Sequence, residues 1–183
     1  NQIESKITDR TKVLLPVHMH GFPADMGTIQ ELAQKYNLTV VEDAAQAHGA
    51  TYQGQMTGSI GDMGCFSLNA TKNLAGGEGG LFTTNDEHYF RRVKMARTFG
   101  EKFDKENETF RPYICYEIGW NYRLPEFSAA FARSQLKRLP DYNAIAQRNG
   151  KYLDDAFARI KGMIPPHTPS GCVTIYHKYR LRF

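Results

Sequence analysis

The chain has 183 residues, 41% of them hydrophobic, which is enough for one substantial globular domain. Its formal net charge of +4 is spread along the chain, so the composition does not require a nucleic-acid partner. No apolar run is long enough to span a bilayer, and the 3 cysteines show neither metal-site spacing nor a disulfide framework. We therefore expect a soluble protein in a reducing cytoplasm.

The first third of the chain alternates between strand and helix patterns. Val13 to Val17 and Leu38 to Glu42 are short apolar runs, as in buried strands. Between them, apolar residues recur at helical spacing from Asp25 to Tyr36, and Asp25 is a suitable N-cap. The pattern predicts a βαβ crossover within an α/β fold.

Two further strands are predicted around a turn that carries a lysine. Met63 to Leu68 and Gly80 to Thr84 bracket Lys72, so its side chain is expected in the crevice at the edge of the sheet. Asp86 then begins a helix. The side chains expected to be buried from this helix onward are Phe90, Val93 and Phe99.

The second half of the chain predicts a loop, an interface and two helices. Glu101 to Arg111 is charged and reads as an exposed loop, whereas Tyr113 to Tyr122 is rich in aromatic residues, as at protein interfaces. Helices are predicted from Pro125 to Leu136 and from Asp141 to Ile160, and a strand from Val173 to Phe183. The packing stripe of the first of these helices is expected at Phe127, Ala130, Phe131 and Ser134.

Lys72 and Asp43 together suggest a specific chemistry. Pyridoxal phosphate needs a lysine that holds its aldehyde as a Schiff base and a carboxylate that keeps its ring nitrogen protonated. Asp43 follows an apolar strand, where pairing with a pyridinium would lower the cost of holding its charge. Taken singly, a lone lysine is usually a solvated charge and a lone aspartate usually a cap.

Several separate segments, in order, strengthen this interpretation. Within the stretch from Lys12 to Lys72, four segments resemble the DegT/StrS group of nucleotide-sugar aminotransferases, which are fold-type I pyridoxal phosphate enzymes: Lys12 to His18, Gly21 to Met26, Glu42 to Ala50 and Gly58 to Ser67. Gly119 to Leu124 is similar to the dimer-contact region of that family. The resemblance covers nearly all of the chain.

The resemblance implies an α/β fold with two parts. Residues 1–139 would be the C-terminal portion of the large mixed-sheet domain that binds pyridoxal phosphate, and residues 140–183 the truncated start of a smaller C-terminal α+β domain. Full-length relatives begin well before Asn1, with a Gly-Ser/Thr segment whose helix N-terminus binds the cofactor phosphate, and continue past Phe183. We therefore expect the chain to be a fragment that binds the cofactor weakly by itself.

The resemblance also implies roles for individual residues. Lys72 would form the Schiff base, Asp43 would pair with the pyridine nitrogen, and Gln46 would lie near the ring oxygen or face. Ser67 would bind the phosphate, and Asn121 would reach the phosphate of a neighbouring subunit in a homodimer. The implied activity is transfer of an amino group from an amino acid, with glutamate expected, to a nucleotide-linked keto-sugar in polysaccharide or antibiotic sugar biosynthesis.

Two alternatives remain open at the level of sequence. A pyridoxal phosphate-dependent sugar dehydratase is one, although such relatives carry histidine where this chain has Lys72; a catalytically silent scaffold or regulatory module is the other. His18, His20 and His48 lack a second ligand at a spacing that identifies a metal site, so no metal is assigned. No nucleic-acid or membrane partner is expected.

Overall fold

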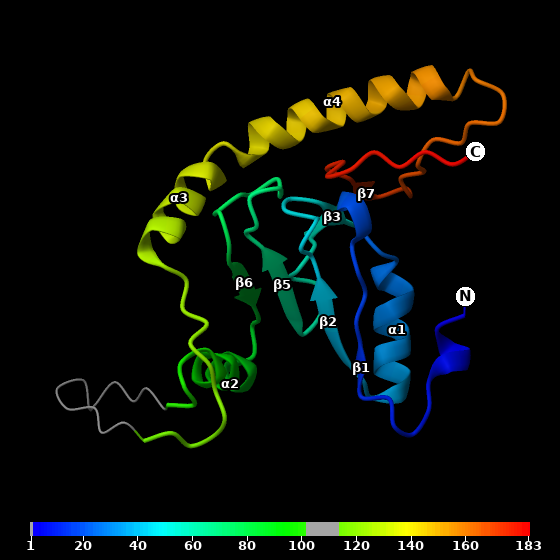
Figure 1. Ribbon diagram of the computed structural model, residues 1–183. Coiled ribbons are helices and arrows are strands. Elements are labelled where there is room, and N and C mark those ends of the chain that lie inside the picture. The colour runs from blue at the N-terminus through cyan, green and yellow to red at the C-terminus, as the bar shows by residue number, and fades with distance from the viewer. Residues whose placement is uncertain (1, 102–113) are drawn as a thin grey trace.

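The computed structural model describes residues 2–101 and 114–183 and is built around a mixed sheet (Figure 1). Its four strands lie in the order β1 (Val13–Leu14), β2 (Thr39–Asp43), β5 (Met63–Ser67) and β6 (Gly80–Thr83). The β1–β2 and β2–β5 pairs are parallel and the β5–β6 pair is antiparallel. The α/β fold with a mixed sheet is therefore confirmed, with each strand within a few residues of its predicted position.

Helix α1 (Met26–Tyr36) connects β1 to β2 and follows the predicted bounds closely. The Asp25 side chain caps it by accepting a hydrogen bond from the Thr28 N–H, and Asn37 ends it in the left-handed conformation, with a φ of 51°. Its apolar face forms a core with one strand residue and one loop residue. The members of that core are Met26, Ile29, Ala33, Val40 and Ile60.

Glu42 fixes the end of the central strand to the loop before β5. The carboxylate is fully buried and accepts hydrogen bonds from the N–H groups of Gly58 (2.7 Å), Ile60 (2.6 Å) and Gly61 (2.7 Å). The Nε2 atom of His18 lies 2.8 Å from Oε2 of Glu42, the oxygen that also accepts from Gly58. A buried charge is tolerated only with such a complete set of partners, so Glu42 ties β2, the 58–61 loop and the segment after β1 together.

A small second sheet receives the C-terminal segment. Its strands lie in the order β4 (Gln55–Met56), β3 (Thr51–Tyr52) and β7 (Cys172–Val173), with both pairs antiparallel. The predicted strand from Val173 to Phe183 is wrong, because pairing stops after two residues. Ile175 then packs, fully buried, against Ala44, Ala47 and Ala50, and Tyr176 adopts a left-handed φ of 45° that no strand could continue through.

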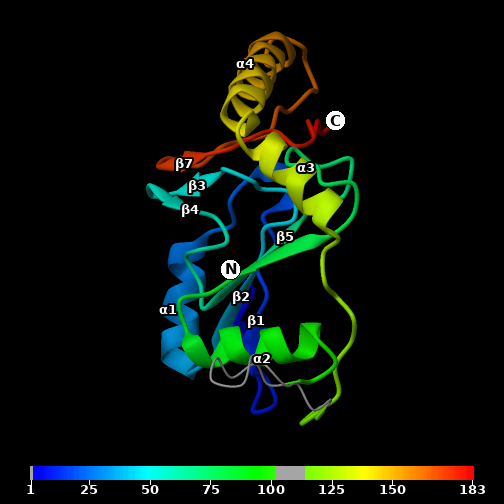
Figure 2. The same ribbon diagram turned by 90° about the vertical axis from the view of Figure 1, so that its left-hand side faces the viewer.

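The remaining helices lie where the sequence predicts them. These are α2 (Glu87–Arg97), α3 (Glu126–Leu136) and α4 (Leu139–Phe157), with single 3₁₀ turns at Glu4–Lys6 and Met19–Gly21. Two views show α4 and the C-terminal segment beyond the ends of the strands (Figures 1 and 2). The predicted loop from Glu101 to Arg111 lies, apart from Glu101, outside the described residues. A division of the chain after residue 139 stays a prediction.

The predicted burial on α2 and α3 is wrong. Phe90 and Phe99 are exposed, and Val93 is only half-buried. On α3 the expected stripe faces outward, with Phe127 92% exposed, while Ala132 on the opposite side is buried against Leu68, Leu74 and Leu139. Periodicity located the apolar face of each helix but could not say whether this chain supplies what covers it. Among the described residues, no helix has the length and apolar character needed to cross a membrane.

Candidate active site

Four of the five predicted site residues lie at or just beyond the carboxyl ends of two neighbouring strands. Asp43 is the last residue of β2 and pairs in register with Cys65 of β5, whose last residue is Ser67. The arrowheads of β2 and β5 point to the same edge of the sheet (Figure 1). Ligands of open α/β sheets bind at such edges, because loops there are held by the strands yet remain accessible.

Asp43 has one carboxylate oxygen in use and one available. Its Oδ1 accepts a hydrogen bond from the Ala45 N–H at 3.0 Å, and the structure gives its other oxygen no partner among the described residues. The side chain is half-buried, where an unpaired negative charge favours a cationic partner. The geometry suits a protonated ring nitrogen.

Lys72 lies on a turn braced by its own hydrogen bonds. The Lys72 N–H donates to the Asn69 carbonyl at 2.9 Å, and the Asn69 side chain accepts from the Thr71 N–H at 3.0 Å. The same asparagine donates to Glu78 at 2.7 Å, across the turn. The lysine is half-buried and therefore is not the fully solvated surface charge that a lone lysine usually is.

Gln46 and Ser67 each accept a hydrogen bond from a backbone N–H and retain hydrogens that they can donate. The Gln46 Oε1 accepts a hydrogen bond from the His20 N–H at 2.8 Å, which leaves its amide nitrogen without a partner among the described residues. The Ser67 Oγ accepts from the Asn69 N–H at 3.2 Å, so its own hydroxyl hydrogen is available. Both side chains can donate to an acceptor at this edge of the sheet.

Asn121 is not brought to the other four residues within one chain. It forms an isolated bridge with Thr98, at the C-terminal end of α2, and is exposed. The structure gives it no contact with Asp43, Gln46, Ser67 or Lys72. Its assigned role in a neighbouring subunit stays a prediction.

Three histidines are linked to these residues, although sequence reasoning gave them no role: the His20 N–H bonds to Gln46, the charge of Lys72 acts on His48, and His177 bonds to Asn73. His48 is 3% exposed and neither of its ring nitrogens has a hydrogen-bond partner among the described residues, and the Nδ1 atom of His20 is buried in the same condition. Burial is the main cause that lowers the pKa of His48 to about 4; electrostatic interactions with His177 and Lys72 act in the same direction, and the Ser67 backbone opposes the shift. His48 is therefore neutral at physiological pH.

The third histidine, His177, comes from the C-terminal segment. Burial is the main cause that lowers its pKa, and the charges of Lys72, Lys178 and His20 act in the same direction. Its Nδ1 lies 2.9 Å from Oδ1 of Asn73, the residue after Lys72. The signals for His20 and His48 were visible as histidines next to predicted site segments, whereas His177 is 104 positions away from Asn73 and had no local signal.

The residues present fit pyridoxal phosphate and do not suggest a metal. Buried polar atoms without partners are rare in native proteins and mark places where a ligand completes the hydrogen bonding. Here such atoms on His20 and His48 accompany the half-buried side chain of Lys72 and the carboxylate of Asp43, one oxygen of which has no partner among the described residues. Within residues 2–101 and 114–183, no group of three or more His, Cys, Asp or Glu side chains could hold a metal ion.

Comparisons with known proteins point to one family. The chain is 35% identical over 182 residues to GDP-perosamine synthase of Caulobacter vibrioides, covering 99% of the chain and 47% of the relative. It is 37% identical over 181 residues to UDP-N-acetyl-3-dehydro-alpha-D-glucosamine 3-aminotransferase of Acidithiobacillus ferrooxidans, covering 98% and 47%. The chain thus spans about half the length of these curated relatives.

A solved structure gives the same answer for the fold. The crystal structure of DesV from S. venezuelae superposes with a TM-score of 0.90 at 36% identity, over 98% of this chain and 47% of DesV. The fold is therefore that of part of a fold-type I pyridoxal phosphate enzyme, as expected. The model of the DegT/DnrJ/EryC1/StrS aminotransferase family matches residues 1–183. The chain belongs to the DegT/DnrJ/EryC1/StrS aminotransferase family.

Proposed function

We propose that the protein containing this chain is a pyridoxal phosphate-dependent aminotransferase that moves an amino group from an amino acid, glutamate being the expected donor, to a nucleotide-linked keto-sugar. The observation that carries the proposal is the arrangement of Asp43 and Lys72 at one edge of the sheet. One offers a free carboxylate oxygen and the other a half-buried amine. Relatives named for GDP- and UDP-linked sugars support the class of acceptor.

Each side chain of the proposed site has a role that follows from its chemistry. When bound, pyridoxal phosphate supplies the electron sink that stabilises a carbanion. Asp43 would hold the proton of the ring nitrogen, and Lys72 would hold the aldehyde through its amine and then move a proton between substrate and cofactor carbons. Gln46 would donate to the ring oxygen and Ser67 to the phosphate, each with the hydrogen that its present bonds leave available.

The assembly and the compartment belong to the same proposal. We place the protein in a homodimer with shared sites, in which Asn121 serves the neighbouring subunit, because Asn121 is exposed and remote from the other four residues. The cysteines Cys65, Cys115 and Cys172 are unpaired, which supports a reducing compartment such as the cytoplasm. A pathway of polysaccharide or antibiotic sugar biosynthesis fits relatives such as the spore coat polysaccharide biosynthesis protein SpsC of Bacillus subtilis.

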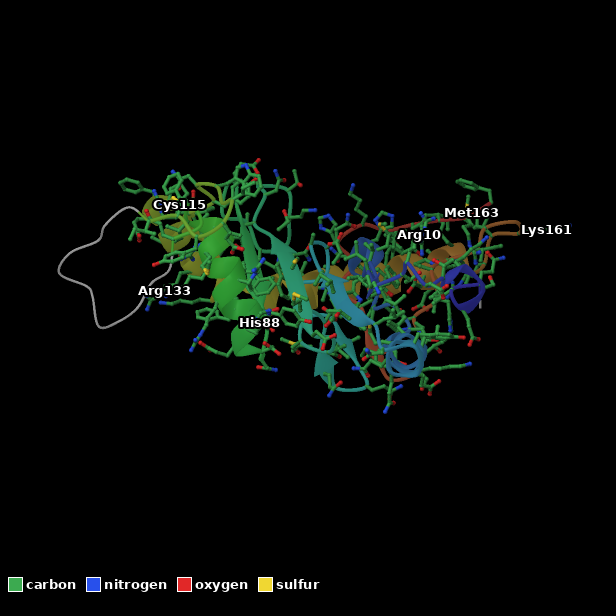
Figure 3. All side chains as sticks on the ribbon, turned by 90° about the horizontal axis from the view of Figure 1, so that it is seen from below. Arg10, His88, Cys115, Arg133, Lys161 and Met163 are labelled. Carbon is green, nitrogen blue, oxygen red and sulfur yellow. The ribbon has the colours of Figure 1, made fainter. Side chains whose placement is uncertain are left out.

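The test uses the longer protein that contains this chain. Lys72→Ala should abolish the visible absorption band of lysine-bound pyridoxal phosphate and reduce turnover by at least about a thousandfold, since nucleophile and proton carrier are both lost. Lys161→Ala is the control, because Lys161 is exposed and lies near the end of the molecule opposite Cys115 (Figure 3). An unchanged band and rate in Lys72→Ala would disprove the role of Lys72.

A half-reaction separates the two enzymatic alternatives. Glutamate alone should convert the bound cofactor to its amine form in an aminotransferase, as followed by loss of the visible band. A sugar dehydratase would show no such stoichiometric conversion without its sugar substrate. A protein with no visible band at all, when supplied with cofactor, would be the silent scaffold.

A further inference from the structure

Asn73 connects the Lys72 turn to two distant parts of the chain. Its Oδ1 lies 2.9 Å from Nδ1 of His177, in the C-terminal segment, and its Nδ2 lies 3.2 Å from Oδ1 of Asn143, on α4. Asn143 in turn donates from Nδ2 to the backbone carbonyl of His48 at 2.8 Å. The bond from Asn143 to the His48 carbonyl is buried and is therefore shielded from competing water, whereas the two bonds of Asn73 are partly buried.

The backbone carbonyl at one end fixes the direction of the whole chain of hydrogen bonds. A carbonyl only accepts, so the group of Asn143 that faces His48 is its NH₂, and its oxygen must face Asn73. The Asn143 oxygen only accepts as well, so Asn73 presents its NH₂ to it and its own oxygen to His177. The Nδ1 atom of His177 must therefore carry the hydrogen.

The consequence lies at the other ring nitrogen of His177. A neutral imidazole that is protonated on Nδ1 has a lone pair on Nε2, which is an acceptor. The structure gives this atom no partner within the described part of the chain. Asn73 directly follows Lys72 in the chain, and His177 lies near enough for the charge of Lys72 to lower its pKa, so this acceptor belongs to the surroundings of the proposed reacting amine.

We propose that His177 is a further active-site residue, whose Nε2 accepts a hydrogen bond from an ammonium group, and that Asn73 and Asn143 are the positioning residues that select the required tautomer. The ammonium is either that of Lys72 or the amino group of the incoming donor. This inference rests on the proposed function and deepens it. It also explains why the C-terminal segment returns to the sheet edge, since without it the site would lack this acceptor.

The tautomer can be measured without cofactor or substrate. Long-range ¹H–¹⁵N correlation spectra of the ¹⁵N-labelled longer protein should show His177 protonated on Nδ1 and unprotonated on Nε2 at neutral pH. Asn73→Ala removes the acceptor and should abolish the preference for this form, whereas Asn149→Ala, an exposed asparagine on α4, should preserve it. A His177 signal protonated on Nε2 in the unsubstituted protein would overturn the inference.

Kinetics of the glutamate half-reaction show which ammonium group, that of Lys72 or that of the donor, bonds to Nε2 of His177. His177→Phe should lower kcat/KM by at least about tenfold, the effect of one lost hydrogen bond to a charged group. A fall in kcat with KM nearly constant assigns the bond to Lys72, and a rise in KM with kcat nearly constant assigns it to the donor amino group. His177→Gln, which retains an acceptor, should recover part of the loss, and His167→Gln, an exposed histidine, is the control.

The visible band keeps the two proposals distinguishable. If unsubstituted protein lacks the band of lysine-bound cofactor, the proposed function fails, whatever the tautomer of His177. If the band is present in His177→Phe and its half-reaction equals that of the unsubstituted protein, the role of His177 fails and the proposed function stands. A band retained with a slower half-reaction, together with the measured tautomer, supports the inference.

Discussion

At the scale of single residues, His18 and His48 differ in how their ring nitrogens are hydrogen-bonded. His18 is used structurally: the Ala24 N–H donates to its Nδ1 at 3.0 Å, so its hydrogen is on Nε2 and points at Glu42. His48 is buried, and neither ring nitrogen has a hydrogen bond of good geometry among the described residues, although the Ser67 backbone lies close enough to affect the His48 pKa. The same residue type therefore completes its hydrogen bonds within the fold at one position and lacks well-formed ones at the other.

Glu42 is the residue whose charge should matter most for stability. Burial alone raises its pKa, but the hydrogen bonds from His18, Gly61, Gly58 and Ile60 together outweigh burial, and the net pKa lies below the usual 4.5. A carboxylate with a depressed pKa stabilises the fold fully above the unfolded value. This contribution should be lost as the pH falls from 4.5 through the lower pKa of the folded state.

Glu42→Gln should therefore destabilise the protein by about 3 kcal/mol at pH 7, because an NH₂ group would face buried N–H donors that need an acceptor. Urea denaturation at pH 7 and at pH 4 measures the effect, and the difference between the two proteins should shrink at the lower pH. Glu31→Gln, on the exposed side of α1, should change stability by less than about 0.5 kcal/mol. Equal stability of Glu42→Gln and the unsubstituted protein at pH 7 would contradict this account.

At the scale of elements, α4 and the C-terminal segment are joined through one carboxylate. Asp154 on α4 accepts hydrogen bonds from the hydroxyl groups of Tyr176 and Tyr179, each at 2.8 Å. Burial and the Asp154 hydrogen bond raise the pKa of Tyr176 to about 12, so the phenol stays protonated and keeps donating. Asp154 and the two tyrosines form a clamp. Because Tyr176 and Tyr179 lie on either side of His177 in the sequence, this clamp holds His177 at the sheet edge.

Gly150 is part of the same contact, which explains a residue that weakens a helix interior. A Cβ atom at this position would lie 2.7 Å from atoms of the Tyr176 ring, which the bond to Asp154 holds in place. Gly150→Ala should therefore lower the free energy of unfolding by about 1–2 kcal/mol, although alanine has the better helix propensity by about 1 kcal/mol.

Asn149→Ala, at the exposed neighbouring position, provides the matched comparison for Gly150→Ala. It should be neutral or stabilise the protein by a few tenths of a kcal/mol. Urea denaturation midpoints of the two variants give the difference directly. A stabilised Gly150→Ala would show that the Tyr176 ring moves freely and that the clamp is weak.

At the scale of the whole molecule, large apolar side chains are exposed on the segment before α3 and on α3 itself. Ile118 is 83% exposed and Phe127 92%, and Trp120 stacks on Tyr122 with ring centroids 5.7 Å apart. Exposed apolar surface of this kind marks an interaction site. It coincides with the aromatic segment and the α3 stripe that the sequence marked for packing, so the proposed homodimer is the partner that we expect there.

Phe127→Asp should shift the longer protein from dimer toward monomer, because a charge replaces a large side chain expected at the centre of the interface. Sedimentation velocity over a range of concentrations measures this shift. Ile160→Asp is the control; Ile160 is also partly exposed, and its neighbour Lys161 lies at the end of the molecule opposite Cys115 (Figure 3). An unchanged dimer in Phe127→Asp would place the interface elsewhere.

The sequence located the helices and strands well because their signals are local. Asp25 and Asp86 cap the helices that they were expected to begin, and each predicted strand of the central sheet lies within a few residues of its range. Family-like segments likewise predicted cofactor-binding roles for Asp43 and Lys72. The errors, as on α3, concern which side of an element is covered, and this depends on partners that no local pattern names.

By itself, then, the sequence determined the fold class and the order of the elements, and it predicted the pairing of an amine with a carboxylate. Only the tertiary structure decided that Glu42 is a buried anchor, and that His48 and His177 lie within electrostatic reach of Lys72. The physical reason is the distance along the sequence over which each kind of interaction acts. Capping and periodicity act within a few residues, whereas the bond from His177 to Asn73 spans 104 positions and exists only once the chain has folded back on itself.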